Sequence, residues 1–126
     1  MKKYLFFLVF SFSLLSACTA EDSTTYYLIR HAEKDRTDKT NRNPNLNFDG
    51  ERRAQNWAEY FKDVHLDAVY STSYKRTIQT ATPTSKIKKL RLQNYNPNKM
   101  YDSVFQSETQ GKTVLVVGHS NTTPDF

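Results

Sequence analysis

One stretch of the chain reads Thr113-Val114-Leu115-Val116-Val117-Gly118-His119. Its run of β-branched and aliphatic residues is typical of a strand buried on both faces, and Gly118 ends the run. Strands of this kind occur mainly in parallel sheets with helices on both sides. The stretch therefore predicts a central strand, with polar residues directly after its carboxyl end.

Segments with strand and helix character alternate through the rest of the chain. The other predicted strands are 26–29, 66–70 and 90–95. Helices are predicted from a cap at Asn47 to about residue 62, from about residue 73, and at 101–107. This alternation favours an α/β fold, specifically a three-layer α/β/α sandwich with a mostly parallel central sheet.

Two residues within the predicted helices carry specific expectations. Gly50 lies in the first turn of the first helix, where a missing side chain permits close packing. Pro83 is expected to break or kink the second helix, because proline lacks the backbone N–H that a helix uses. The first helix also shows one apolar stripe at helical spacing, formed by Ala54, Trp57, Ala58 and Phe61.

The N-terminus has the features of a bacterial export signal. Lys2 and Lys3 precede a short apolar core that ends in Leu15-Ser16-Ala17-Cys18. This ending resembles the lipoprotein signal, in which the cysteine becomes the lipidated first mature residue. We therefore expect a signal peptide at 1–17, a lipid-anchored tether at 18–25 and a domain at 26–126, exported to the bacterial cell envelope. The alternative is an uncleaved anchor with an incidental cysteine.

The charge balance fits an anionic partner without calling for nucleic acid. The formal charge is +5, and removal of Lys2 and Lys3 with the leader lowers it to +3. So mild an excess suits a small phosphorylated substrate, a phosphoprotein or membrane headgroups. Cys18 is the only cysteine, so no internal disulfide can form.

Polar residues with related chemistry follow three of the predicted strands. Arg30-His31 follows the first strand, Arg76 comes shortly after the second, and His119 follows the last. Parallel strands end at one edge of a sheet, where ligands bind in open α/β folds. We therefore expect two histidines and two arginines at one edge.

These four side chains suit phosphoryl transfer. Guanidinium groups match phosphate oxygens and stay charged, and a neutral imidazole is a competent nucleophile near pH 7. Gly118 and the helix start at Thr122 are expected to offer close backbone approach and free N–H groups to the anion. Phosphoryl transfer depends mainly on positioning and charge neutralisation, which these groups supply without a metal or cofactor.

Other site chemistries are open at this point. A serine triad could combine Ser120 with His31 and an aspartate, although no glycine-flanked elbow surrounds the serine. A zinc site could use His31, His119 and a carboxylate, although closely spaced ligands are missing. His65 lies between a helix and a strand and is interpreted as a surface residue.

Four blocks of the chain, in order, resemble the histidine phosphatase superfamily, the phosphoglycerate mutase-like enzymes. The resemblance covers about residues 25–126. The blocks are Leu28-Ile29-Arg30-His31-Ala32-Glu33-Lys34, then Leu46-Asn47-Phe48-Asp49-Gly50 with Ala54, then Val69-Tyr70-Ser71-Thr72-Ser73 with Arg76, Gln79, Thr80 and Ala81, and finally Val114 to Val117 with Gly118-His119-Ser120-Asn121-Thr122.

The resemblance implies a role for each matching residue. His31 would be the nucleophile that forms phosphohistidine, and Arg30, Arg76 and His119 would complete the phosphate pocket. It implies a phosphatase that uses no metal. Mutase activity ranks lower, because an exported enzyme would not meet glycolytic intermediates.

The chain departs from the family pattern in two ways. Ser120 stands where one branch has its acidic proton donor, and Asp102, Glu33 and Asp125 are unconvincing substitutes, so the general acid is unassigned. Family members also continue past the second histidine, so the resemblance implies a domain that is incomplete at its C-terminus. The alternative functions are a lipid-anchored phospholigand-binding protein without turnover and an inactive fragment.

Overall fold

The computed structural model describes residues 23–126. The expected signal peptide and Cys18 lie outside the described residues. Within residues 23–126, no helix has both the length and the apolar character that crossing a bilayer requires.

Four parallel strands form the sheet, in the order β1-β4-β2-β3. The strands are β1 (Thr25–Arg30), β2 (Ala68–Ser71), β3 (Leu92–Asn94) and β4 (Thr113–Gly118). The helices are α1 (Phe48–Phe61), α2 (Lys75–Lys88) and α3 (Ser103–Thr109), with 3-10 turns at Pro97–Lys99 and Thr123–Asp125. Every predicted strand and helix is present, with ends that differ by one or two residues from the prediction.

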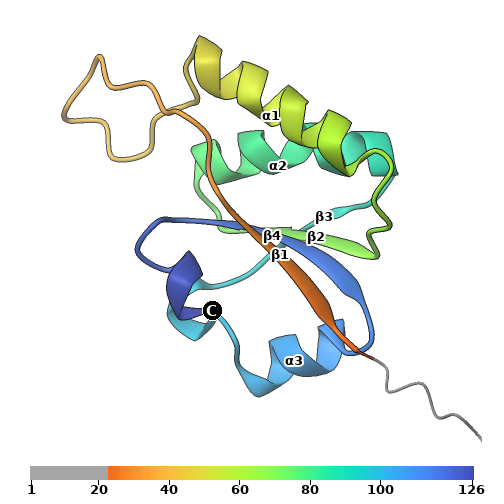
Figure 1. The fold of residues 1–126 in the computed structure, drawn as a ribbon. Coiled ribbons are helices and arrows are strands. Elements are labelled where there is room, and N and C mark those ends of the chain that lie inside the picture. The colour runs from red at the N-terminus through yellow and green to blue at the C-terminus, as the bar shows by residue number, and fades with distance from the viewer. Residues whose placement is uncertain (1–22) are drawn as a thin grey trace, which may run out of the picture.

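The elements are arranged in three layers. Figure 1 shows α1 and α2 on one face of the sheet and α3 with the C-terminal 3-10 turn on the other. On the α1–α2 face, Leu115 and Val117 pack with Phe61, and on the α3 face Val114 and Val116 pack with Phe105. Alternate residues of β4 thus enter two different cores, which explains the uninterrupted apolar run. The predicted α/β/α sandwich is confirmed.

The start of α1 matches the expectation for Asn47 and Gly50. The Asn47 side-chain oxygen accepts a hydrogen bond from the Gly50 N–H at 2.9 Å. A Cβ atom built at Gly50 would lie 2.1 Å from the Glu33 carbonyl oxygen. Glycine therefore lets the segment after β1 pass against the helix, which fixes the backbone two residues beyond His31.

Pro83 does not break α2, contrary to one of the two outcomes expected for it. The helix continues through Pro83 to Lys88, although the proline cannot donate to the Gln79 carbonyl. Residues on both sides of the proline are buried, among them Ala81 and Thr84. Packing of these residues against α1 and the sheet outweighs a local cost of about 3 kcal/mol.

Candidate active site

The carboxyl ends of β1, β4 and β2 bring the expected side chains to one place. The backbone N–H of His31, just past β1, donates to the carbonyl of Gly118, the last residue of β4, at 2.9 Å. The His31 and His119 ring centroids are 5.5 Å apart. Sheet register alone therefore places the two imidazoles next to each other, from segments that are 88 residues apart in the sequence.

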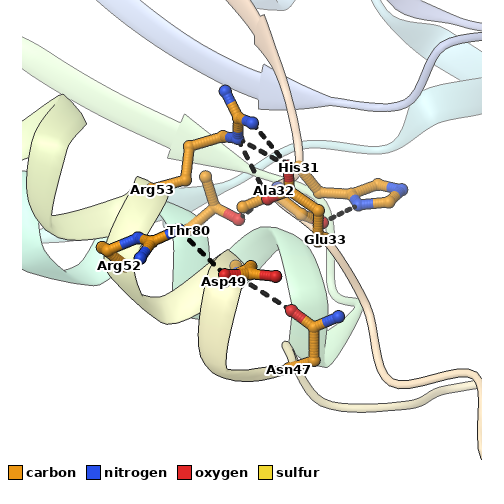
Figure 2. Close-up of polar contacts among 9 residues, drawn as sticks. His31, Ala32, Glu33, Asn47, Asp49, Arg52, Arg53 and Thr80 are labelled. Carbon is orange, nitrogen blue, oxygen red and sulfur yellow. Dashed lines mark hydrogen bonds and ion pairs between the residues drawn. The ribbon is translucent and has the colours of Figure 1, made fainter.

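The backbone fixes the protonation pattern of His31. Its Nδ1 lies 2.7 Å from the Ala32 carbonyl oxygen, a contact drawn as a dashed line in Figure 2. A carbonyl oxygen can only accept, so Nδ1 carries the proton and the neutral ring has its lone pair on Nε2. Burial lowers the pKa of His31 below its ordinary value, and nearby cationic residues lower it further. His31 is therefore neutral near pH 7, with a free nucleophilic nitrogen.

The segment that follows β1 is fastened on two sides. The Ala32 N–H donates to the Thr80 hydroxyl at 2.9 Å, and that hydroxyl donates to the Arg76 carbonyl at 2.7 Å. Figure 2 shows Arg53 reaching from α1 to Glu33, where its Nε lies 2.8 and 2.9 Å from the two carboxylate oxygens. Thr80 thus links the backbone next to His31 to the turn of α2 that carries Arg76.

His119 is held deeper than His31 and is only 8% exposed. Its Nε2 lies 2.9 Å from the Thr72 hydroxyl, and its Nδ1 lies 3.5 Å from Nη2 of Arg76. Burial lowers the pKa of His119 to about 4, with further lowering by the charge of Arg76 and other cations. This imidazole is neutral at pH 7.

Arg76 contributes a partly buried cation to the site. Its Nε and Nη1 are buried, and neither has a hydrogen-bond partner within residues 23–126. The guanidinium carbon lies 4.5 Å from the centroid of the Tyr74 ring, a cation–π contact. Burial lowers the pKa of Arg76, but an arginine stays protonated under working conditions. The arrangement leaves donors unused on a desolvated positive charge, which favours an anion beside it.

Arg30 lies at the edge of this group. It is exposed at the end of β1, and its charge lowers the pKa of both histidines. It also lines a groove of about 850 Å³ that extends from His31 toward Trp57 on α1. Three of the four expected residues therefore lie together, and Arg30 lies beside them among the residues that line the groove.

The two alternative site chemistries find no support in the described part of the chain. Residues 23–126 contain no group of three or more metal-ligating side chains, so a zinc site is not assembled. Ser120 is exposed, and His31 directs Nδ1 at a backbone carbonyl where a triad would need a carboxylate.

Gly118 has a packing role that was not predicted from the sequence. A Cβ at this position would lie 2.6 Å from the Tyr95 hydroxyl and 2.7 Å from the Thr123 hydroxyl, so the glycine makes room for side chains of the fold. The N–H groups of Thr122 and Thr123 both donate to the His119 carbonyl. These two donors are therefore not free to bind an anion.

The carboxylates weighed as general acids lie in other roles. Asp102 caps α3 by accepting from the Phe105 N–H at 2.9 Å, and α3 lies on the face of the sheet opposite α1 and α2. Glu33 is paired with Arg53, at 2.6 Å in the shortest contact. Asp125 is exposed in the last 3-10 turn. The general acid stays unassigned.

Several residues that shape this site have no role predicted from the sequence. Tyr74 lies with its ring 5.0 Å from that of His119 and stacks on Arg76. Thr72 and Thr80 stand within the resembling blocks, but their hydrogen bonds to His119 and Ala32 follow only from tertiary structure. The signal available in the sequence was that these residues stand in or next to the resembling blocks that contain the site histidines and arginines.

We predict that His119, which is buried, and His31, which is partly buried, make the folded chain less stable in acid. Between the lowered pKa values and 6.5, the unfolded chain binds more protons than the folded one. Stability is therefore full above pH 6.5 and is lost as the pH falls toward 4. Urea midpoints measured between about pH 5 and 7 should decline on acidification, and His119→Gln should flatten that decline. An equal slope in the variant would contradict the prediction.

The chain is similar to known proteins in sequence and in fold. The family model described as histidine phosphatase superfamily (branch 1) matches residues 26–96, which include His31 and Arg76 and end before His119. No curated protein sequence matches significantly.

Solved structures share the fold. A protein from Agrobacterium tumefaciens, provisionally described as phosphohistidine phosphatase SixA, is 24% identical with a TM-score of 0.66, over 81% of this chain and 73% of that one. A second one so described, from Nakamurella multipartitia, is 26% identical with a TM-score of 0.59, over 81% and 62%. A phosphoglycerate mutase from Bacillus anthracis is 17% identical with a TM-score of 0.61, over 81% and 78%. The family model matches more than half of the chain, and the solved structures share its fold. The chain therefore belongs to the histidine phosphatase superfamily.

Proposed function

We propose that the chain is a phosphatase that works through a phosphohistidine intermediate on His31. The observation that carries the proposal is the Arg76 guanidinium, whose buried Nε and Nη1 lack partners within residues 23–126, beside two neutral imidazoles. A buried cation without a counter-ion is costly, and a phosphate group supplies both the charge and the acceptors that it lacks. The free Nε2 of His31 supplies the nucleophile.

The proposed reaction has two displacement steps. Nε2 of His31 attacks phosphorus, and the bond from phosphorus to the leaving group breaks with its electron pair going to that group. A water molecule then attacks the phosphohistidine, the bond from phosphorus to Nε2 breaks, and inorganic phosphate leaves. Arg76, His119 and Arg30 neutralise the equatorial oxygens during both steps. Leaving groups that depart without protonation suit this site, since no general acid is assigned.

The proposed substrates are phosphomonoesters or phosphorylated proteins, with phosphohistidine as one candidate. The Nakamurella protein's description as a phosphohistidine phosphatase supports that candidate. The groove at His31 is open and lined by Arg30, Lys34 and Arg36, which suits a large or anionic leaving group.

Turnover of p-nitrophenyl phosphate by the full chain tests the proposal. We expect release of nitrophenol and competitive inhibition by inorganic phosphate, which should also raise the melting temperature. Thermal protection by phosphate without turnover of any phosphorylated compound would favour the phospholigand-binding alternative. If phosphate gives no thermal protection and no phosphorylated compound is turned over, both functions are excluded.

We also propose that the protein is a lipid-anchored protein of the bacterial cell envelope. The support is the sequence at the N-terminus, where a short apolar core ends in Leu15-Ser16-Ala17-Cys18. Labelled fatty acid should be incorporated by the wild-type chain in bacteria and not by Cys18→Ser. Incorporation by the variant would contradict an anchor at Cys18.

A further inference from the structure

Two buried threonine hydroxyls form a chain that ends on His119, at the ring nitrogen that does not face Arg76. Nε2 of His119 lies 2.9 Å from the Thr72 hydroxyl, which lies 2.8 Å from the Thr77 hydroxyl. The Thr77 hydroxyl lies 2.8 Å from the Tyr74 carbonyl and 3.0 Å from the Thr72 carbonyl. Both threonines are completely buried, so the protons in this chain have few alternative partners.

The carbonyl oxygens set the direction of the chain. A carbonyl can only accept, so the one hydroxyl proton of Thr77 points at a carbonyl. The contact between the two hydroxyls then requires Thr72 to donate to Thr77. Since the Thr72 proton is used in this way, its oxygen must accept from Nε2 of His119. The ring therefore carries a proton on Nε2.

The contact made by Nδ1, on the opposite side of the ring, leads independently to the same tautomer. Nη2 of Arg76, at 3.5 Å, can only donate, so Nδ1 of His119 must present a lone pair to it. We infer that the Thr72 and Thr77 hydroxyls fix neutral His119 as its Nε2–H tautomer and so reserve Nδ1, beside Arg76, as the atom that takes up a proton when a phosphate group binds. The phosphate-binding step of this inference rests on the proposed function.

The charges around His119 explain why the proton arrives only with the ligand. The groups that act on this ring are Arg76, His31, Arg30 and Lys34, all cationic or neutral, and together with burial they oppose protonation. A bound phosphate dianion reverses this balance. The solvent then supplies a proton that adds to the Nδ1 lone pair. Thr72 accepts from the Nε2–H before and after this step, so that hydrogen bond is unchanged, while Nδ1 changes from an acceptor facing Arg76 to a donor to the phosphate group.

Nitrogen NMR of the full chain, labelled in histidine, tests the tautomer directly. Without ligand, we expect His119 to show a protonated, pyrrole-like Nε2 and an unprotonated, pyridine-like Nδ1. Saturating inorganic phosphate at pH 7 should move both nitrogens toward the imidazolium position. A pyridine-like Nε2 without ligand would overturn the inference, as would an unprotonated Nδ1 in the phosphate complex. Failure of phosphate to bind would instead refute the proposed function, and the spectrum without ligand would still show which tautomer His119 adopts.

Variants of Thr72 separate positioning from a merely structural role. Thr72→Val leaves the Nε2–H without an acceptor, so phosphate affinity should fall about 10-fold to 100-fold and His119 should resist protonation in the complex. Thr72→Ser should restore both within about threefold, since it keeps the hydroxyl. Thr84→Val is the matched control, because the buried Thr84 hydroxyl has no partner within residues 23–126.

A merely structural role for Thr72 would give a different result. The Thr72→Val chain would then melt at a lower temperature, yet His119 would still become an imidazolium in the phosphate complex. That outcome would overturn the inference. If Thr72→Val does not fold, the wild-type nitrogen spectrum still decides the question.

Discussion

His31→Ala should abolish turnover, with a fall in kcat of about 10⁴-fold to 10⁶-fold, comparable to the loss when a member of a catalytic group that acts as a unit is removed. The physical reason is that the Ala32 carbonyl holds the Nδ1 proton and so leaves only Nε2 free to attack phosphorus. Steady-state hydrolysis of p-nitrophenyl phosphate measures the effect. Rapid quenching should trap an acid-labile phosphoenzyme in the wild type and none in the variant.

His65→Ala is the matched control for this variant. The His65 side chain is 77% exposed and pairs with Asp67 at 2.8 Å, away from the two site histidines. Its kcat should equal that of the wild type. Turnover by His31→Ala at the wild-type rate, or an acid-stable phosphoenzyme, would refute the proposed mechanism.

Arg76→Ala should lower kcat/KM by about 10³-fold, because the phosphate group loses the buried guanidinium that neutralises it. Arg76→Lys should recover little of this loss, since an ammonium cannot form the same fork of hydrogen bonds. Arg52→Ala, which removes an exposed cation paired with Asp49, is the control and should leave kcat/KM unchanged.

Arg76→Ala should affect stability in the opposite direction from activity. In the absence of ligand, Arg76 is a desolvated charge with two unsatisfied donors within residues 23–126, so its removal should leave the melting temperature unchanged or raise it. The gain in melting temperature that phosphate gives the wild type should disappear. An unliganded variant that is strongly destabilised, with phosphate protection intact, would show that Arg76 serves the fold and not the anion.

Local sequence determined the elements of this protein because their signals are local. The spacing of apolar side chains indicates which face of a segment is buried. In β4 this indication is confirmed, because alternate residues enter two different cores. Asn47 caps α1 because its side chain reaches an N–H only three residues away. The sequence also placed His31, Arg76 and His119 at one edge, since parallel strands end together and that order follows from the alternation of elements.

Tertiary structure alone decided the features that depend on partners distant in the sequence. Pro83 stays inside α2 because packing on both sides of it outweighs one missing hydrogen bond. Gly118 is explained by Tyr95, which the fold brings against it from a distant segment, and by Thr123 in the turn that follows β4. Such contacts cannot be predicted from the spacing of residues along the chain.

The protonation states of the site are decided in the same way. The tautomer of His31 follows from a neighbouring carbonyl, and that of His119 follows from Thr72, 47 residues earlier in the sequence. The sequence by itself determined which groups meet at the edge of the sheet. Only the three-dimensional contacts decided which nitrogen of each ring holds a proton, because a hydrogen bond depends on where its partner lies in space.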